Sequence, residues 1–355
     1  MYHVAIIGES LGAQVASLAC AASGFHDVHR LQGSRHPSEQ PQVYSLGANA
    51  SRLLRALVPE SIEGLGFQPD RRQVRFAKSA YLLAELPLGE FYQQRYGSPL
   101  VNFSAPALTA YLEEHIGNPL KNSMPLNDAE ISHQLTVLAD SERGTKASDD
   151  DPSFLIYHAS LPDHPLRKAN VLWRGNGQYV EQLADNDQVH FRFITRADIP
   201  FDPEQWHDSL QDAFAAKMQV GGVSLNGFTA GETLFAGRVA YLQSALTPAS
   251  QIRVDADNTA LEDAWVLSRM MENYEEDIGD GLAAFERFRR PRHRKVAVQL
   301  RDHLLKLTEP SVSKRFSQHV GMALQNRLLP ELALAQQDWL YEHDVIKGFR
   351  YPGHT

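Results

Sequence analysis

The chain has 355 residues, of which 43% are hydrophobic and 22% charged, with a formal net charge of −9. This length allows one large or two medium domains with a sizeable core, and the composition is ordinary for a globular protein. The negative charge argues against a broad nucleic-acid-binding surface.

The single cysteine, Cys20, excludes an internal disulfide and a cysteine-based zinc site. Met1 leads straight into an apolar run, so we expect no signal peptide. No run is long and apolar enough for a membrane span. We therefore expect a cytoplasmic protein.

The first 32 residues predict a β-α-β unit of a dinucleotide-binding fold. His3–Ile7 is the short apolar run of a buried strand, and the turn Gly8–Ala13 follows it. Gln14–Ala22 has the apolar spacing of a helix, and Asp27–Gln32 is the second strand. A strand, tight turn and helix in this order can hold a diphosphate at the helix N-terminus.

The turn matches the G-x-G-x-x-G/A pattern only in part. Gly8 fits the first glycine, and Ala13 is small enough for the third position. Ser10 stands where a second glycine would let a pyrophosphate approach the backbone. Glu9 adds a negative charge beside that position, which at ~5 Å and a dielectric constant of ~20 costs a diphosphate roughly 3 kcal/mol. A β-α-β unit with no nucleotide is therefore the alternative interpretation.

The second strand ends in Gln32, where an acidic residue would hold the ribose hydroxyls. A neutral amide makes a weaker hydrogen bond than a carboxylate does. The sequence thus predicts the scaffold of a dinucleotide site with weakened ligand contacts.

The middle of the chain begins with a mixture of helices and strands and continues with antiparallel strands. Residues up to 152 predict a helix at Asn49–Leu57, a hairpin of Gln73–Ala77 and Ala80–Ala84, a helix at Pro106–Ile116, a strand at Gln134–Ala139 and a loop at Asp140–Pro152. Residues from 154 predict strands at Phe154–His158, Gln178–Leu183 and Val189–Ile194, then an amphipathic helix at Pro203–Met218. We expect Trp173 and Trp206 in the core of this inserted block, with substrate stacking as the alternative role.

The last third of the chain begins with a further buried strand of the first domain and ends in helices. Val239–Leu242 is a buried strand, and helices are predicted at Asn258–Asn273, Gly281–Leu307, Val312–Gln325 and Glu331–Tyr341. We therefore expect one domain from residues 1–150 plus 220–355 and an antiparallel sheet domain from 151–219 with part of 70–100. The basic run Phe288–Lys295 is interpreted as a solvated helix face.

Histidines lack the spacing of a metal site. His158 and His164 are six residues apart in what reads as a loop, and His26 and His29 flank a strand. Neither pair has the i, i+4 spacing of helical ligands, so no metal site is predicted.

Several segments carry a resemblance to a known family. They are Gly237–Pro248, Asn258–Leu267, Phe285–Arg292, Asp338–Asp344, Arg95–Pro99 and Ala48–Ala50. Over nearly the whole chain the sequence resembles the class A flavoprotein aromatic hydroxylases, the group of para-hydroxybenzoate and salicylate hydroxylases.

The resemblance implies an α/β fold: a Rossmann-like FAD-binding domain, interrupted by an antiparallel substrate domain, with a helical C-terminus. It also implies reduction of FAD by NAD(P)H and oxygen transfer to a small aromatic substrate. The flavin carries that chemistry, so the protein must above all supply a good flavin site.

The sequence departs from the family at the positions that hold FAD. Ser244 stands where the family has an aspartate near the ribityl phosphate, and Val254–Ala256 replaces a Gly-x-Gly beside the ring. A family arginine falls near Ala105, and the middle Gly-Ala-Asp-Gly segment is not found after Leu138–Asp140. The candidate cofactor-binding positions are Gly8, Ser10, Gly12, Ala13, Gln32, Ser244, Pro248 and Asn258.

Each lost hydrogen bond is worth ~1–3 kcal/mol, so several together weaken binding by over ~1000-fold. The sequence therefore predicts a fold relative that binds FAD weakly or not at all, with NAD(P)H relevant only if FAD binds. Such a protein would bind a small aromatic-type ligand, partner a true hydroxylase or catalyse a cofactor-independent step. A working FAD-dependent hydroxylase is the alternative, and no residue is assigned a catalytic role.

Gly8-x-Ser10-x-Gly12 also spells the nucleophile elbow of a hydrolase, which is likewise a strand-turn-helix. Ser10 would then need a later acid and histidine. His293, His303 and His319 lie late in the chain, but no motif marks any of them. The family resemblance explains the turn better.

Overall fold

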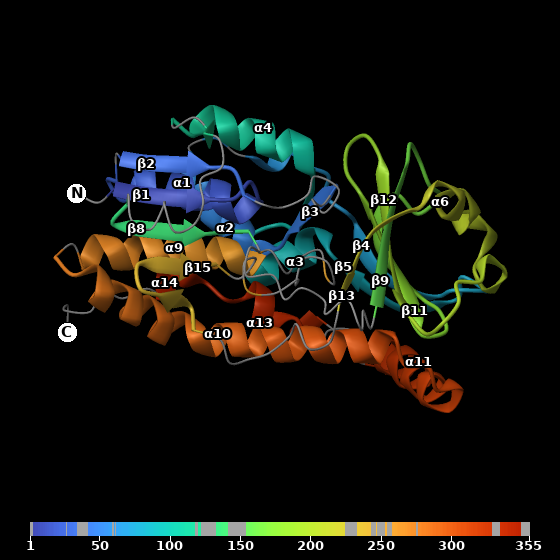
Figure 1. The fold of residues 1–355 in the computed structure, drawn as a ribbon. Helices are drawn as coiled ribbons and strands as arrows, with labels where there is room; N and C mark the ends of the chain where they lie inside the picture. Colours follow the sequence, from blue (N-terminus) through green and yellow to red (C-terminus); the bar gives the residue numbers. More distant parts are fainter. Residues whose placement is uncertain are drawn as a thin grey trace.

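The structure is a computed structural model that describes residues 3–25, 27–33, 42–58, 60, 62–117, 120–121, 133–140, 154–223, 233–242, 246, 253, 258–274, 276–328 and 334–348. Two sheets lie side by side, and the long helices α10 (Ile278–Leu307) and α11 (Val312–Leu328) run beneath them (Figure 1). The chain therefore has the α/β fold with a helical C-terminus that the sequence predicts.

The first sheet is mainly parallel and has the strand order β14-β15-β8-β1-β2-β7. Its strands are β1 (His3–Ile7), β2 (Asp27–Leu31), β7 (Leu120–Lys121), β8 (Leu135–Leu138), β14 (Phe235–Ala236) and β15 (Val239–Tyr241). β1 pairs in parallel with β2 on one side and with β8 on the other, so the carboxyl ends of all three strands meet at one edge. In this fold class that edge is where ligands bind.

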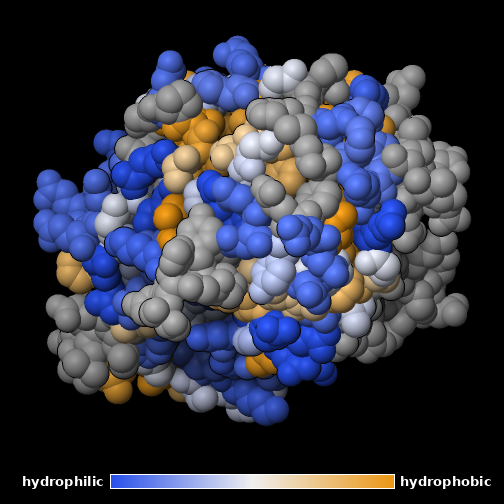
Figure 2. Space-filling view, turned by 90° about the vertical axis from the view of Figure 1, so that its left-hand side faces the viewer, coloured by the Kyte–Doolittle hydropathy of each residue, from blue (hydrophilic) through white to orange (hydrophobic). Residues whose placement is uncertain are grey.

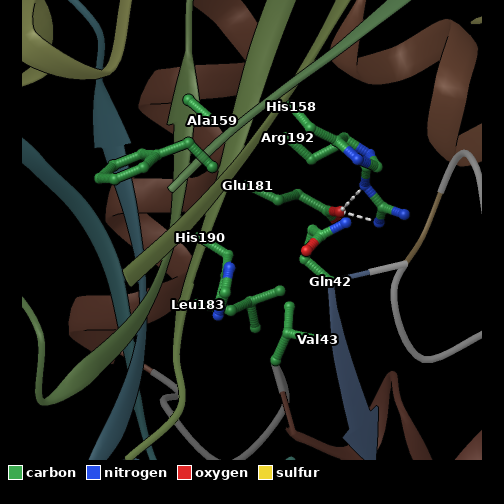
Figure 3. A pocket seen from close by; sticks show the side chains of 9 residues that line it. Gln42, Val43, His158, Ala159, Glu181, Leu183, His190 and Arg192 are labelled. Atoms are coloured by element: carbon green, nitrogen blue, oxygen red, sulfur yellow. Dashed lines mark hydrogen bonds and ion pairs between the residues drawn. The ribbon is translucent and has the colours of Figure 1, made fainter. Parts of the chain in front are cut away.

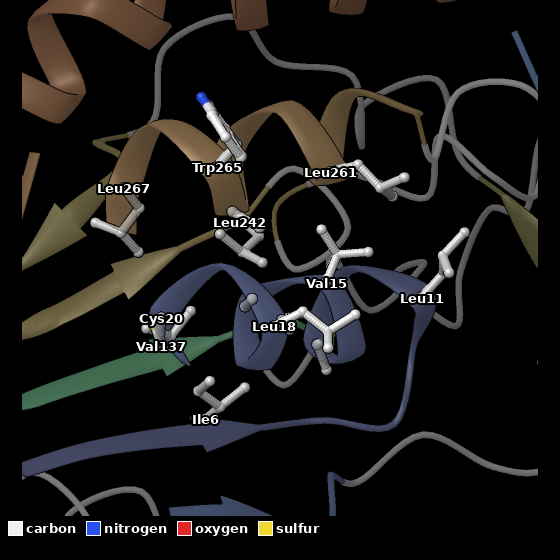
Figure 4. Close-up of a cluster of buried hydrophobic side chains, with 14 of the residues drawn as sticks. Ile6, Leu11, Val15, Leu18, Cys20, Val137, Leu242, Leu261, Trp265 and Leu267 are labelled. Carbon is white, nitrogen blue, oxygen red and sulfur yellow. The ribbon is translucent and has the colours of Figure 1, made fainter. Parts of the chain in front are cut away.

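Two helices that are distant in sequence pack against each other on one face of this sheet. α1 (Leu11–Ala22) follows β1, and α9 (Asn258–Asn273) packs against it in one hydrophobic core (Figure 4). Figure 4 shows side chains from the sheet, α1 and α9, such as Ile6, Leu18 and Leu261, meeting in that core. The C-terminal third is therefore part of the first domain's core.

The second sheet has seven strands in the order β13-β9-β12-β11-β10-β4-β5. Its strands are β4 (Arg71–Phe76), β5 (Leu82–Pro87), β9 (Phe154–Leu161), β10 (Ala169–Arg174), β11 (Gln178–Ala184), β12 (Val189–Arg196) and β13 (Met218–Val223). All neighbouring strands are antiparallel except β10 and β4. Trp173 and Trp206 lie in the core on one face, as predicted, and α10 packs against the other face through Leu300 and Leu304.

Shorter elements connect the two sheets and cover the outside. The bounds are α2 (Ala48–Leu57), α3 (Gly89–Tyr96), α4 (Ala105–His115), α6 (Gln211–Ala216), α13 (Asp338–Tyr341), α14 (Val345–Gly348), η2 (Ile62–Leu65), η3 (Pro203–Gln205), η4 (Asp208–Leu210), and the antiparallel pair β3 (Val43–Leu46) and β6 (Val101–Ser104).

The predicted helix at Pro203–Met218 is wrong. The segment forms the short helices η3, η4 and α6 and then enters β13 at Met218. Between η3 and η4, the Trp206 ring is buried in the core and the His207 N–H donates to the Ala77 carbonyl. Those two contacts hold the chain in an extended conformation that an uninterrupted helix could not adopt. Strand β10 was not expected. His158 lies in strand β9, as the predicted strand Phe154–His158 has it, and not in a loop shared with His164.

The surface is largely hydrophilic where Figure 2 shows it. Hydrophobic residues form small separate patches on that face, the left-hand end of the molecule in Figure 1. Among the described helices, none combines the length and the apolar character needed to cross a membrane.

Candidate functional site

The turn between β1 and α1 is built around Gly8 and Asp140. Gly8 has a φ of 135°, in the region that favours glycine. A Cβ added to it would lie 2.7 Å from Cγ of Asp140, which follows β8 at the next strand end. Both its backbone conformation and the close carboxylate therefore require glycine at this position.

Hydrogen bonds from within the chain satisfy much of this turn. The buried Asp140 carboxylate accepts the N–H of Glu9 at 2.6 Å and the N–H of Ser10 at 3.3 Å. Ser10 is the N-cap of α1: its Oγ accepts from the Ala13 N–H at 3.4 Å and donates to the Ala139 carbonyl at 3.4 Å. Leu138–Asp140, expected to precede a deletion, thus form the strand end that braces the turn.

The other predicted positions on this edge are divided between core and surface. Gly12 and Ala13 are buried in the first turn of α1, while Gln32 is exposed just beyond β2 and its N–H donates to the Lys121 carbonyl. The structure thus brings the predicted residues of the first 32 positions to one edge. It gives Ser10 a capping role within the chain, rather than an open backbone position for a phosphate.

Asn258 begins α9, and its side chain is fully buried. Among the described residues, neither its amide nitrogen nor its amide oxygen has a hydrogen-bond partner. A buried, unsatisfied amide costs ~1–3 kcal/mol, and a ligand could satisfy it. Ser244, Pro248 and Val254–Ala256 lie outside the described residues.

A network of buried charges joins α9 to α10. Glu262 contacts Arg289 at 2.8 Å and Arg292 at 2.9 Å, and Asp263 contacts Arg289 at 2.6 Å and His293 at 2.9 Å. Burial alone would raise the pKa of Glu262, but Arg292 and Arg289 outweigh it and lower the pKa to about 2. Glu262 is therefore charged at neutral pH.

The interpretation of Phe288–Lys295 as a solvated face is wrong for three of its eight residues. Arg289, Arg292 and His293 point into the protein, because Glu262 and Asp263 on α9 supply the matching charges. The pairing joins segments 26 to 30 residues apart in sequence, and helical spacing alone does not reveal it. These residues fix the angle of α9, and thereby the position of Asn258.

A pocket lies between the second sheet and the segment that enters β3. It is a half-open hollow with about 330 Å³ of space between atoms, a volume that includes open solvent. Strands β9, β11 and β12 and the start of β3 supply its lining: Gln42, Val43, His158, Ala159, Glu181, Leu183, His190, Phe191 and Arg192. Figure 3 shows the charged groups together at one end and Leu183 and Val43 at the other. The pocket thus offers one polar end and one apolar end.

The polar end is held by a partly buried ion pair. Arg192 Nε donates to Glu181 across neighbouring strands at 3.1 Å, and a second nitrogen of Arg192 contacts the same carboxylate. Burial, together with Arg192 and His190, lowers the pKa of His158 to about 4. His158 is therefore neutral at physiological pH and can accept or donate one hydrogen bond on each side of its ring.

Sequence reasoning missed the lining of this pocket. Glu181 and Leu183 are two residues apart on β11, and His190 and Arg192 are two apart on β12, so each pair shares one face of its strand. The sequence of each strand alone therefore shows which of its residues lie together. Which strands are neighbours, and in which register, depends on the sheet order. That order places the unexpected β10 between β11 and β4. Among the described residues, no cluster of His, Cys, Asp and Glu forms a potential metal site.

Comparisons with known proteins place the fold. No family model matches the sequence, and no curated protein matches it either. Among solved structures, the chain is similar to a variant of Klebsiella pneumoniae HpxO complexed with FAD, with a TM-score of 0.74 and 16% identity, over 96% of this chain and 99% of that one.

Two further structures agree. A salicylate hydroxylase substrate complex has a TM-score of 0.69 and 14% identity, over 97% of this chain and 96% of that one. CtdE in complex with FAD and a substrate has a TM-score of 0.66 and 12% identity, over 98% and 96% of the two chains. The protein therefore has the fold of class A flavoprotein monooxygenases, as the resemblance implies. At these identities the likeness establishes the fold alone.

Proposed function

We propose that this protein binds a small aromatic-type ligand in the pocket between its second sheet and the start of β3, and holds FAD weakly or not at all. The fold supports a division into residues 1–150 plus 220–355, with the parallel sheet, and 151–219 with part of 70–100, with most of the antiparallel sheet. The pocket lies where the second sheet faces the start of β3.

The β1–α1 turn is the observation that supports weak flavin binding most directly. Asp140 takes the N–H groups of Glu9 and Ser10, and Ser10 itself caps Ala13. A diphosphate would meet these satisfied donors and a buried carboxylate, whose like charge repels it. The exposed Gln32 offers the ribose hydroxyls no carboxylate. These residues do not fit the diphosphate and ribose of FAD.

The pocket supports the ligand class. Its lining combines apolar side chains with a few polar groups, as the lining of a small-molecule site does. Leu183 and Val43 suit the face or edge of a ring, while Arg192, with His158 beside it, suits an acidic or carbonyl substituent. Structures of similar fold contain uric acid in HpxO and a substrate in salicylate hydroxylase. We therefore choose urate and salicylate as probes.

The second candidate is an FAD- and NAD(P)H-dependent hydroxylase of a small aromatic compound. Asn258 favours it, because both polar atoms of this fully buried side chain lack a partner within the part of the chain that the structure describes. A bound flavin would be one way to satisfy them. A partnership with a true hydroxylase is a further prediction from the sequence.

Titration of the purified protein with salicylate and urate, without added FAD, tests the proposal. We expect a rise in Tm or a calorimetric signal with at least one probe. Arg192→Gln should weaken that binding about tenfold or more, because a charged hydrogen bond is worth ~1.5–3 kcal/mol. Arg196→Gln is the matched control, since Arg196 lies on the same strand but pairs with Asp198 outside the pocket lining. No response to either probe, or a response only after FAD is added, would contradict the proposal.

A further inference from the structure

A serine, a histidine and an aspartate form a continuous hydrogen-bonded line beside the pocket. Ser160 on β9 faces His190 on β12 in the antiparallel register. Ser160 Oγ lies 2.8 Å from Nδ1 of His190, and Nε2 of His190 lies 2.9 Å from Oδ2 of Asp185. Asp185 stands in the turn that joins β11 to β12. The three side chains come from two adjacent strand ends and one tight turn.

The directions of these hydrogen bonds follow from the carboxylate. Burial alone would raise the pKa of Asp185, but hydrogen bonds from His190 and from the backbone of Gln188 and Asp187 lower it overall. An ionised carboxylate only accepts hydrogen bonds, so Nε2 of His190 carries the proton. Nδ1 is then free to accept the Ser160 hydroxyl proton. This is the order of a nucleophile, a base and an orienting acid, with the two ring nitrogens exchanged relative to the trypsin-like arrangement.

The turn holds the acid in place independently of the histidine. Asp185 Oδ1 accepts the N–H of Asp187 at 2.9 Å and the N–H of Gln188 at 2.7 Å, which leaves Oδ2 for His190. Asp185 is 3% exposed and His190 8% exposed. Buried groups of this kind, with each polar atom partnered, keep one geometry.

The line reaches the pocket through His190, which is among its lining residues. Ser160 follows the lining residue Ala159, and its side chain is only half-buried. Arg192, the next residue on the same face of β12, brings a positive charge to that pocket. A carbonyl compound in the pocket would therefore meet a hydroxyl with its base on one side and a cation on the other.

We propose that Ser160, His190 and Asp185 form a nucleophilic site that hydrolyses esters of small aromatic acids, without a cofactor. Ser160 Oγ forms a bond to the acyl carbon while its proton passes to Nδ1 of His190. The carbon–oxygen bond to the leaving alcohol breaks, and that alcohol takes the proton from His190. Water then attacks the acyl-serine, gives its proton to His190, and releases the acid while Ser160 regains its proton. The inference rests on the proposed function only for the aromatic part of the substrate.

The chain contains its own matched control. Ser209 Oγ lies 3.0 Å from Nδ1 of His207, and Ser209 is also half-buried in the same sheet domain. No carboxylate contacts His207 in the part of the chain that the structure describes. Reactivity that any serine–histidine pair can produce would thus appear at both serines. Reactivity that needs a carboxylate to orient the histidine would appear at Ser160 alone.

The test is labelling with a fluorophosphonate, located by peptide mass spectrometry, together with hydrolysis of methyl benzoate and 4-nitrophenyl benzoate. We expect the label on Ser160 and not on Ser209, and a loss of at least about 100-fold in kcat/KM in Ser160→Ala and His190→Gln. Asp185→Asn should also lose activity, because its amide would donate to Nε2 and force the wrong ring tautomer. Ser209→Ala should stay within twofold of the unchanged protein.

Salicylate binding, measured by Tm on the same variants, separates this inference from the proposed function. If the Ser160→Ala variant binds salicylate as tightly as the unchanged protein does, the variant is folded. Its rate of ester hydrolysis can then be interpreted. Salicylate binding with no label on Ser160, or hydrolysis that persists in Ser160→Ala, would overturn the nucleophilic site and leave the proposed function standing. Labelling of Ser160 without salicylate binding would support the site and overturn the ligand class.

Discussion

The carboxylate of Asp140 accepts the backbone N–H of Glu9 across 2.6 Å, so the end of β8 braces the turn that opens α1. The contact joins residues 131 positions apart and places a buried negative charge at the helix N-terminus. Asp140→Ala would leave the Glu9 and Ser10 N–H groups without this acceptor. We expect the free energy of unfolding to fall by about 1–3 kcal/mol, measured by urea denaturation. Asp198→Ala, which removes an exposed ion pair, should change it by less than ~1 kcal/mol.

Gly8→Ala should be more destabilising than an ordinary glycine substitution. The new Cβ would have both a strained φ and a contact of 2.7 Å with Asp140. Gly97→Ala is the control, because Gly97 also has a positive φ, of 75°, but no atom lies within 4 Å of the added Cβ. We expect a loss of about 1–3 kcal/mol from strain in both variants, and a further loss in Gly8→Ala alone. Equal losses would show that Asp140 yields freely and does not brace the turn.

Glu262→Gln should break the buried network between α9 and α10. Arg289 and Arg292 would keep their charges with one carboxylate fewer, which typically costs ~3–5 kcal/mol in a buried site. Glu272→Gln, on the same helix, removes a partly exposed pair with Arg269 and should cost less than ~1 kcal/mol. Similar losses of stability in the two variants would contradict a structural role for the buried charges.

The stability of the protein should fall as the pH is lowered from neutrality. Burial is the first cause that lowers the pKa of His158, His319 and His343 to about 4, against an ordinary value of 6.5. The unfolded chain therefore binds more protons between about pH 6.5 and 4, and folding is weakened across that window. Glu262, with its pKa lowered to about 2, adds a further loss below about pH 4.5.

Urea denaturation at pH 8 and at pH 5 measures this dependence. His158→Gln should show a smaller loss between the two pH values than the unchanged protein does, because one of the titrating groups is gone. Its stability at pH 8, where His158 is neutral in both states, is the internal reference. An unchanged difference between pH 8 and pH 5 would show that His158 is hydrated when charged in the folded state.

Restoring family residues should improve flavin binding if the first domain keeps its shape. Ser10→Gly removes the cap and opens the backbone, while Ser244→Asp restores a family acid at a position outside the described residues. We expect the double variant to bind FAD more tightly than the unchanged protein, by fluorescence titration. No gain would mean that the first domain has closed and no longer has space for a flavin.

The sequence predicts the elements with strong local patterns. β1 and α9 have the predicted bounds, since each is a compact apolar run or a long amphipathic helix with clear ends. The family resemblance also implies that an antiparallel sheet domain interrupts the Rossmann-like domain. Pairings between distant segments are different: Asp140 with Glu9, Glu262 with Arg289, and Ser160 with His190 each depend on strand register or helix packing. No periodicity within one segment encodes such a contact.

The absorbance spectrum of the purified protein, recorded before and after incubation with excess FAD and removal of free flavin, shows whether the chain holds a flavin. We expect a colourless protein that retains little or no flavin, because the β1–α1 turn is satisfied from within and carries the Asp140 charge. A yellow protein that holds about one flavin per chain, reducible by NADH or NADPH, would contradict this expectation.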